Sequence, residues 1–204
     1  MNILSILAHP RSDSFCQAVF DTANATLADN GHSLVIHNLY KESFDPILKA
    51  EESYTIGLTV EEAFHQSDDP LILAHRRDIA QAEGLLMVHP NWWGKPPAIL
   101  AGWLDRILVP GVAYRLASAQ SLPEGLLVLE RALIFNTSDT PAEREAVLGD
   151  PLNLIWRNCV LPFCGSPTIE RHMFGPMASS TDDARRNWLN QVEDAVTRTF
   201  GVAS

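Results

Sequence analysis

Short apolar runs that alternate with helical repeats restrict the fold of this chain more than any other feature. The runs span residues 3–8, 34–37, 84–89 and 132–136, and a fifth is expected within 167–172. Between and after them, apolar residues recur at helical spacing in segments 15–27, 70–82, 97–108, 152–160 and 181–200. Strands that are apolar throughout are typical of a parallel sheet covered on both faces, and each intervening helix makes a right-handed crossover. The sequence predicts an α/β, doubly wound fold with a five-stranded parallel sheet and helices on both faces.

Length and charge restrict the classes of function. No repeat or flexible linker divides the 204 residues, so we expect a single domain over 1–204, with a surface excursion at about 40–69. The formal net charge of −10 argues against nucleic acid as a partner. The three scattered cysteines predict neither a disulfide framework nor a zinc site. Because no signal peptide or membrane-length apolar run is seen, we expect a cytoplasmic protein without stable membrane insertion.

The loop at 9–15, after the first strand, is a candidate anion site. His9, Arg11 and Ser14 stand directly before a predicted helix, whose first N–H groups and dipole attract negative charge. A second interpretation stays open, in which Ser12 or Asp13 only caps the helix and Arg11 is solvated. The loop has neither the dinucleotide nor the Walker pattern. Cys16 lies inside the helix and is interpreted as a packing residue rather than a nucleophile.

The loops after the third and fourth strands are candidate ligand-binding loops. Residues 89–97 contain the adjacent Trp92 and Trp93 in a loop stiffened by three prolines. We expect one indole to pack inward while the other, or the loop backbone, lines a flat ligand, although both rings covering the sheet end is the alternative. Residues 136–140 are polar, and their amides can bind the edge of a heterocycle, unless Asp139 or Thr140 serves only as a helix cap.

No metal site is predicted, because the histidines at positions 32, 65, 75 and 172 have no partner at a metal-binding spacing.

Together, several motifs give the chain a specific resemblance. They are the segment Leu7-Ala-His-Pro-x-Arg-x-x-Ser-Phe15, the segment from Pro90 to Arg106, Ala113-Tyr114, Gly149-Asp150, Trp156 and Phe163-Cys-Gly165. In this order they resemble the flavodoxin-like NAD(P)H:quinone oxidoreductase family. The resemblance implies strand order 2-1-3-4-5, a noncovalent flavin (FAD rather than FMN), NAD(P)H as co-substrate, a quinone-like acceptor reduced in a ping-pong cycle, and a homodimer.

The resemblance also assigns residues to the flavin. It implies that 9 and 14–16 contact the phosphates, 90–94 lie along the isoalloxazine, 136–139 meet its polar edge, and Tyr114 lies at the substrate mouth. With Arg11 from the anion loop, the predicted cofactor-binding residues are His9, Arg11, Ser14, Phe15, Cys16, Pro90, Asn91, Trp92, Trp93, Gly94, Asn136, Thr137, Ser138 and Asp139.

One segment departs from the family pattern. Well-known members carry a Tyr and a His after the fourth strand that assist hydride transfer, whereas residues 140–148 of this chain contain neither. We hypothesise that Arg144, or a backbone N–H near Ser138, stabilises the reduced flavin anion instead. Two other functions stay open, a flavodoxin-like electron carrier and an accessory flavoprotein that regulates a membrane transporter.

Overall fold

The computed structural model describes residues 1–53, 59, 61–62, 65–115, 122–165 and 167–203. Its main sheet consists of β1 (Asn2–Leu7), β2 (Ser33–Asn38), β3 (Gly84–Pro90), β6 (Arg131–Thr137) and β7 (Thr168–Phe174). All neighbouring strands are parallel and the order is β2-β1-β3-β6-β7. The predicted fold class and strand order are therefore confirmed, with β7 reaching two residues beyond the predicted 172.

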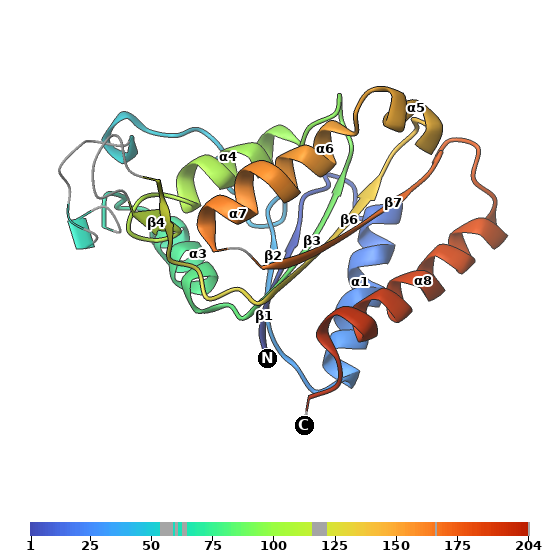
Figure 1. Cartoon of the computed structure of the whole chain (residues 1–204), viewed down its shortest axis with the longest axis horizontal. Helices are drawn as coiled ribbons and strands as arrows, with labels where there is room; N and C mark the ends of the chain where they lie inside the picture. Colours follow the sequence, from blue (N-terminus) through green and yellow to red (C-terminus); the bar gives the residue numbers. More distant parts are fainter. Residues whose placement is uncertain (54–58, 60, 63–64, 116–121, 166, 204) are drawn as a thin grey trace.

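Helices cover both faces of the sheet, as Figure 1 shows. One face carries α1 (Phe15–Asp29) and α8 (Asp182–Phe200). The other carries α3 (Pro70–Gln81), α4 (Ala98–Ile107) and the helical segment at 151–164. Consecutive strand residues point to opposite faces of the sheet and pack in two different hydrophobic cores. Leu4 and Ile6 pack in one core, and Ile3 and Leu7 pack in the other. This double burial is why the strands are apolar throughout.

The ends of the longest helices follow from local chemistry. Ser14 caps α1 by accepting a hydrogen bond from the Gln17 amide, so the cap is neither Ser12 nor Asp13. Gly31, with φ 82°, follows the last turn in the left-handed conformation that is common after helix ends. Thr181 caps α8 in the same way as Ser14 caps α1, by accepting from the amide three residues ahead.

The segment at 142–164 differs in detail from its prediction. Helix α5 (Ala142–Val147) begins after Pro141, which stands at the cap position without a side-chain hydrogen bond, so the alternative in which Asp139 or Thr140 caps this helix is wrong. Helix α6 (Pro151–Leu154) is capped by Asp150, whose side chain accepts from the Asn153 amide. It continues into the π-helix η2 (Ile155–Val160) and α7 (Leu161–Cys164). Pro162 lacks an amide hydrogen and cannot make the regular helical bond, which explains the wider turn before it.

Two features lie outside the predicted alternation. A small antiparallel sheet pairs β4 (Tyr114–Arg115) with β5 (Glu124–Gly125). Part of the expected excursion at 40–69 falls on residues outside the described ranges. Its described part includes the 3₁₀ helix η1 (Ala50–Glu52) and is anchored in the interior, because the Glu52 side chain is buried.

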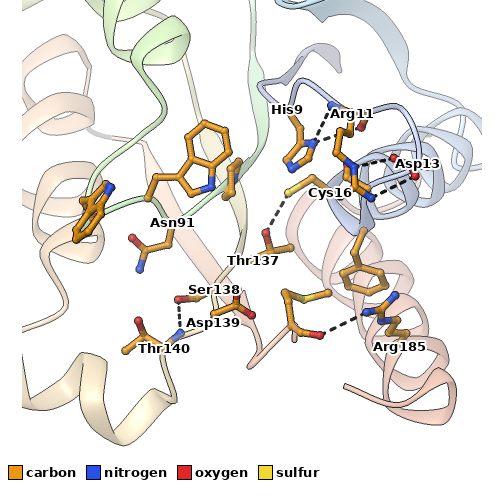
Figure 2. Close-up of a pocket in the computed structure, with 16 residues that line it drawn as sticks. His9, Arg11, Asp13, Cys16, Asn91, Thr137, Ser138, Asp139, Thr140 and Arg185 are labelled. Atoms are coloured by element: carbon orange, nitrogen blue, oxygen red, sulfur yellow. Dashed lines mark hydrogen bonds and ion pairs between the residues drawn. The ribbon is translucent and has the colours of Figure 1, made fainter. Parts of the chain in front are cut away.

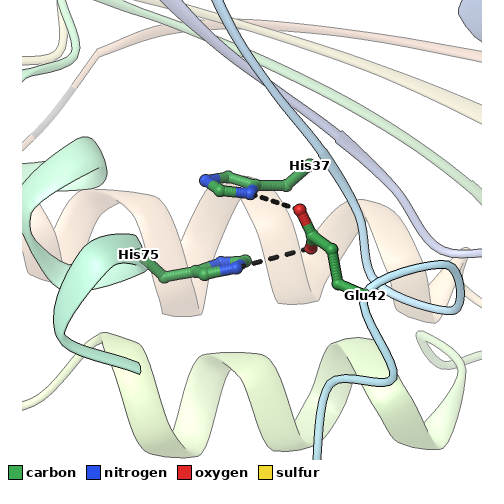
Figure 3. A group of neighbouring side chains, drawn as sticks. All are labelled: His37, Glu42 and His75. Atoms are coloured by element: carbon green, nitrogen blue, oxygen red, sulfur yellow. Dashed lines mark hydrogen bonds and ion pairs between the residues drawn. The ribbon is translucent and has the colours of Figure 1, made fainter. Parts of the chain in front are cut away.

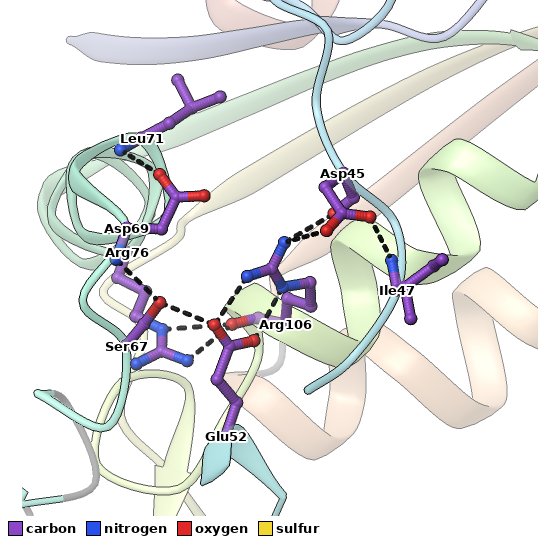
Figure 4. Close-up of polar contacts among 8 residues, drawn as sticks. All are labelled: Asp45, Ile47, Glu52, Ser67, Asp69, Leu71, Arg76 and Arg106. Atoms are coloured by element: carbon purple, nitrogen blue, oxygen red, sulfur yellow. Dashed lines mark hydrogen bonds and ion pairs between the residues drawn. The ribbon is translucent and has the colours of Figure 1, made fainter. Parts of the chain in front are cut away.

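That anchor is an ion pair with α4. The Arg106 guanidinium donates two hydrogen bonds to the Glu52 carboxylate, at 2.6 and 2.7 Å, and a third to the Asp45 carbonyl at 2.7 Å. Ser67 donates to the same carboxylate at 2.6 Å, and Arg76 donates to the Arg106 carbonyl (Figure 4). Burial acts to raise the pKa of Glu52, but these hydrogen bonds outweigh it and hold the pKa below its usual value. The excursion is therefore fixed at both of its described ends.

Candidate functional site

A pocket of about 640 Å³ opens at the carboxyl ends of β1, β3 and β6. Its volume is in the range of small-molecule sites, and its position is where open parallel sheets bind ligands. Figure 2 shows His9, Arg11 and Arg185 on one side of this space and Asn91 with residues 138–140 on the other. The lining residues are His9, Arg11, Asp13, Ser14, Phe15, Cys16, Pro90, Asn91, Trp92, Trp93, Thr137, Ser138, Asp139, Thr140, Met177 and Arg185. The structure thus brings together twelve of the fourteen residues predicted to bind the cofactor.

The start of α1 provides hydrogen-bond donors on one wall. Because Ser14 accepts from Gln17, the amides of Phe15 and Cys16 are the helix N–H groups without an acceptor in their own helix. Two cations flank them. Arg11 forms an exposed ion pair with Asp13, and the Arg185 guanidinium lies 6.0 Å from the centre of the Phe15 ring. This wall is suited to an anion.

His9 stands between the anion wall and the tryptophan loop. Its Nδ1 lies 3.1 Å from the Arg11 amide nitrogen and 3.2 Å from the Arg11 carbonyl oxygen. Burial, aided by the charge of Arg11, lowers the pKa of His9 despite its backbone hydrogen bond and the opposing charge of Asp13. Its ring centre lies 6.2 Å from that of Trp92. At neutral pH, His9 is therefore an uncharged group in the pocket wall.

The two tryptophans occupy a tight turn. Trp92 and Lys95 exchange backbone hydrogen bonds of 3.2 and 3.3 Å, and Trp93 and Gly94 between them have φ values of 61° and 72°. This is the left-handed geometry of a type I′ turn, which is unusual for a bulky residue. Trp92 is 38% exposed and Trp93 96% exposed. The expectation that one indole packs inward is therefore wrong, and the strained turn presents both rings outside the core.

The third wall follows β6. The Thr137 hydroxyl lies 3.2 Å from Cys16 Sγ, and burial raises the pKa of Cys16 to about 11. A thiol with this pKa is not a nucleophile at neutral pH, in agreement with the packing role predicted for Cys16. Asp139 accepts a hydrogen bond from the Ala178 amide at 2.7 Å, which ties the wall to the loop before α8.

Two residues predicted to bind the cofactor lie off the pocket lining. Gly94 faces Pro151 rather than the space, at the corner of the turn. Asn136 is fully buried and donates to His89 Nε2, while it accepts a 2.6 Å hydrogen bond from Arg171. Burial lowers the pKa of His89 to about 4, so its neutral ring donates from Nδ1 to the Pro90 carbonyl. Asn136 thus supports the wall from behind rather than forming it.

Tyr114 and Arg144 also lie away from the lining. The Tyr114 ring packs edge-on against Phe163, with ring centres 4.6 Å apart. Arg144 is exposed on α5. The structure therefore puts neither side chain in the wall of the pocket.

The sequence interpretation missed four lining residues: Asp13, Thr140, Met177 and Arg185. Asp13 and Thr140 were weighed only as caps, and both stand in loops already singled out. Met177 and Arg185 come from the end of the chain, after a strand whose following loop was not considered. The rule that ligands bind outside the carboxyl ends of strands pointed to that loop too.

A separate polar cluster lies between β2, the turn after it and α3 (Figure 3). His37 lies 2.8 Å from Glu42 and 2.9 Å from Asp78, and His75 lies 3.4 Å from Glu42. His75 thus has close partners that its sequence spacing did not indicate. The Trp103 indole donates to Nδ1 of His75 at 2.9 Å, so neutral His75 keeps its proton on Nε2, the nitrogen that faces Glu42. That nitrogen is therefore not available as a metal ligand.

This cluster predicts a pH-dependent contribution to stability. Burial acts to lower the pKa of His37, but Glu42 and Asp78 outweigh it and raise the pKa. Burial acts to raise the pKa of Glu42, but the contacts with His37 and His75 outweigh it and lower that pKa to about 2. Charged His37 therefore stabilises the fold below its unfolded pKa, and this contribution is lost as pH rises through the raised value. We expect His37→Gln to cost about 1 kcal/mol more at about pH 6 than at about pH 9. Urea unfolding of both proteins at the two pH values measures this, and an equal cost at both would contradict it.

Comparison with known proteins gives consistent matches over most of the chain. A family profile described as a flavodoxin-like fold matches residues 1–196. An "Uncharacterized NAD(P)H oxidoreductase" of Haemophilus influenzae is 32% identical over 91% of this chain and 89% of that protein. The "NAD(P)H dehydrogenase [quinone] 1" of Rattus norvegicus is 26% identical over 93% of this chain and 76% of the rat protein.

A solved structure agrees with the fold. The "NAD(P)H:quinone oxidoreductase from Methanothermobacter marburgensis" superposes with a TM-score of 0.82 at 22% identity, covering 96% of this chain and 97% of that one. Among the helices in the described ranges, none has the length and apolar character to cross a bilayer.

Proposed function

This chain belongs to the flavodoxin-like fold family, and on that premise we propose that it binds a flavin in the pocket at 9–16, 90–93 and 137–140 and transfers electrons from NAD(P)H to a quinone-like acceptor. It is an oxidoreductase of the NAD(P)H dehydrogenase type, as are its relatives over most of its length. The identities of 32% and 26% to these relatives support this class.

The observation that carries the proposal is the donor-rich wall at the start of α1. Two helix amides without helical acceptors, the Ser14 hydroxyl and the cations Arg11 and Arg185 face one pocket. A flavin phosphate supplies the matching anion.

The opposite end of the pocket is suited to the ring system. A bound flavin would supply the chemistry, accepting a hydride from NAD(P)H and passing two electrons to the second substrate in turn. Asn91 and Trp92 would lie along the ring, and residues 137–139 would meet its polar edge. The exposed Trp93 would border the entrance, where the nicotinamide and the acceptor are held close to the ring.

We further propose FAD as the flavin. A second cavity of about 120 Å³, which shares His9 with the main pocket and includes Tyr40 and Lys41, offers room beyond the phosphate wall. The adenosine part of FAD would occupy this second cavity, whereas FMN ends at its phosphate and would leave the cavity empty.

We also propose a homodimer in the cytoplasm. Four apolar side chains along 147–163 are exposed (Val147, Leu148, Leu154 and Phe163), and Phe163 packs against Tyr114, the predicted mouth residue. A second copy that covers this stretch would bury these side chains and lie close to Tyr114. Three free cysteines are consistent with a reducing compartment.

The Arg144 hypothesis has no support from a pocket contact, since Arg144 is exposed on α5. A backbone N–H near Ser138 remains the proposed donor. The Ser138 amide is used by the Phe174 carbonyl and the Thr140 amide by the Ser138 hydroxyl, which leaves Asp139.

The test is to purify the protein after expression with added riboflavin and to identify the extracted flavin by mass. We expect a yellow protein that oxidises NAD(P)H in the presence of a benzoquinone. A protein that takes up neither FAD nor FMN would contradict the proposal. A flavoprotein that NAD(P)H cannot reduce would favour the electron-carrier alternative, and co-purification with a membrane transporter would favour the accessory role.

A further inference from the structure

Glu145 is a buried acid directly behind two walls of the pocket. It lies on α5 and is 4% exposed. Its Oε1 accepts a 2.6 Å hydrogen bond from Asn91 Nδ2 and lies 3.3 Å from the Ser138 hydroxyl. Asn91 lines the pocket from the loop after β3, and Ser138 from the loop after β6. One carboxylate therefore joins both loops.

The surrounding hydrogen bonds fix the direction of these contacts. The Gly94 amide donates to Asn91 Oδ1 at 2.9 Å, which turns the Asn91 NH₂ group toward Glu145. The Thr140 amide donates to the Ser138 hydroxyl oxygen at 3.1 Å, which leaves the hydroxyl proton for Glu145. Glu145 Oε1 thus receives donors on both sides, as a carboxylate does.

No cation balances this charge within the described part of the chain, where Glu145 forms no ion pair with Lys, Arg or His. The nearest residue in sequence with a positive charge, Arg144, is exposed. A buried, unpaired charge acts over a longer range than a solvated one, because little water screens it.

We propose that Glu145 is a positioning residue that, through Asn91 and Ser138, holds the pocket walls against the ring and lowers the reduction potential of the bound flavin. The inference rests on the proposed function. Reduction adds negative charge to the ring, and a carboxylate fixed behind Asn91 and Ser138 opposes that charge. Electrons taken from NAD(P)H would then pass more readily to the acceptor. In this chain an acid thus occupies the segment that carries a Tyr and a His in well-known members.

The experiment compares Glu145→Gln with Glu143→Gln in the flavin-loaded protein. Glutamine keeps the volume and the Oε1 acceptor of Glu145 but removes the charge, and Glu143 is an exposed acid on the same helix. The midpoint potential is measured by equilibration with a reference dye, and the dissociation constant of FAD by titration. Stopped-flow absorbance gives the rates of reduction by NAD(P)H and of oxidation by a benzoquinone.

We expect the equilibrium with the dye to shift about tenfold toward reduced flavin in Glu145→Gln, about 30 mV for a two-electron couple. Flavin reduction should become faster and flavin oxidation slower, with Glu143→Gln unchanged. An unchanged potential in Glu145→Gln overturns the proposal. Loss of FAD binding in Glu145→Gln alone also overturns it, in favour of a purely structural role. A wild-type protein that takes up no flavin instead contradicts the proposed function.

Discussion

Replacing Arg106 with Met is expected to lower the free energy of unfolding by about 3 to 5 kcal/mol. The Glu52 carboxylate is 2% exposed and receives two hydrogen bonds from Arg106, so the variant leaves a buried charge without its counterion. The third hydrogen bond, to the Asp45 carbonyl, is lost as well. For a chain of this length the melting temperature should fall by roughly 10 °C. Urea unfolding and calorimetry measure both quantities.

The control is the double variant Arg106→Met with Glu52→Met. Apolar residues of similar volume can replace a buried ion pair at little cost, so the double variant should regain most of the lost stability. A double variant as unstable as Arg106→Met would show that the loss comes from packing of α4 rather than from the orphaned charge.

Replacing Ser14 with Asp is expected to weaken the binding of FAD by about 100-fold or more, close to 3 kcal/mol. Asp is as good a helix cap as Ser, so it can accept from the Gln17 amide and keep α1 intact. Its negative charge, however, stands where the phosphate is proposed to bind. Two like charges about 4 Å apart repel by about 4 kcal/mol near a protein surface. Titration calorimetry with FAD and FMN measures the loss.

Two comparisons separate charge from shape at this position. Ser14→Asn has the size of the Asp variant and caps equally well but adds no charge, so it should bind FAD far more tightly than Ser14→Asp. Riboflavin has no phosphate, and Ser14→Asp should bind it as the wild type does. Equal FAD affinity in Ser14→Asp and wild type would refute a phosphate at the start of α1.

The fold was predictable because its determinants are local. Each buried strand needs apolar side chains on both faces, and runs such as 3–8 and 84–89 satisfy this within the strand itself. The short strands β4 and β5 have two residues each and leave no such pattern. The π-helix η2 precedes Pro162, which lacks an amide hydrogen. The proline can be read from the sequence, but it does not determine which form the helix distortion takes.

The site was predictable only where it is built from loops that follow strands with a clear apolar sequence pattern. The segments 9–16 and 137–139 line the pocket as expected, because the carboxyl ends of neighbouring parallel strands meet at one edge. Arg185 reaches the pocket from a helix about 170 residues further along the chain, and only the packing of α8 against α1 brings it there. The role of Glu145 was not predictable, because acidic residues in a short, highly charged helix are usually exposed to solvent.

Trp93, with its left-handed backbone conformation, also serves as an intrinsic fluorescent probe of the pocket. Trp103 and Trp156 are shielded from water, whereas the Trp93 ring is almost fully hydrated at the rim of the pocket. Indole emission moves to longer wavelengths in water, and soluble quenchers reach only accessible rings. Iodide should therefore quench the long-wavelength part of the native tryptophan fluorescence first. A ligand that covers Trp93 would shield its fluorescence from iodide. Binding to the pocket can therefore be followed in the unmodified protein.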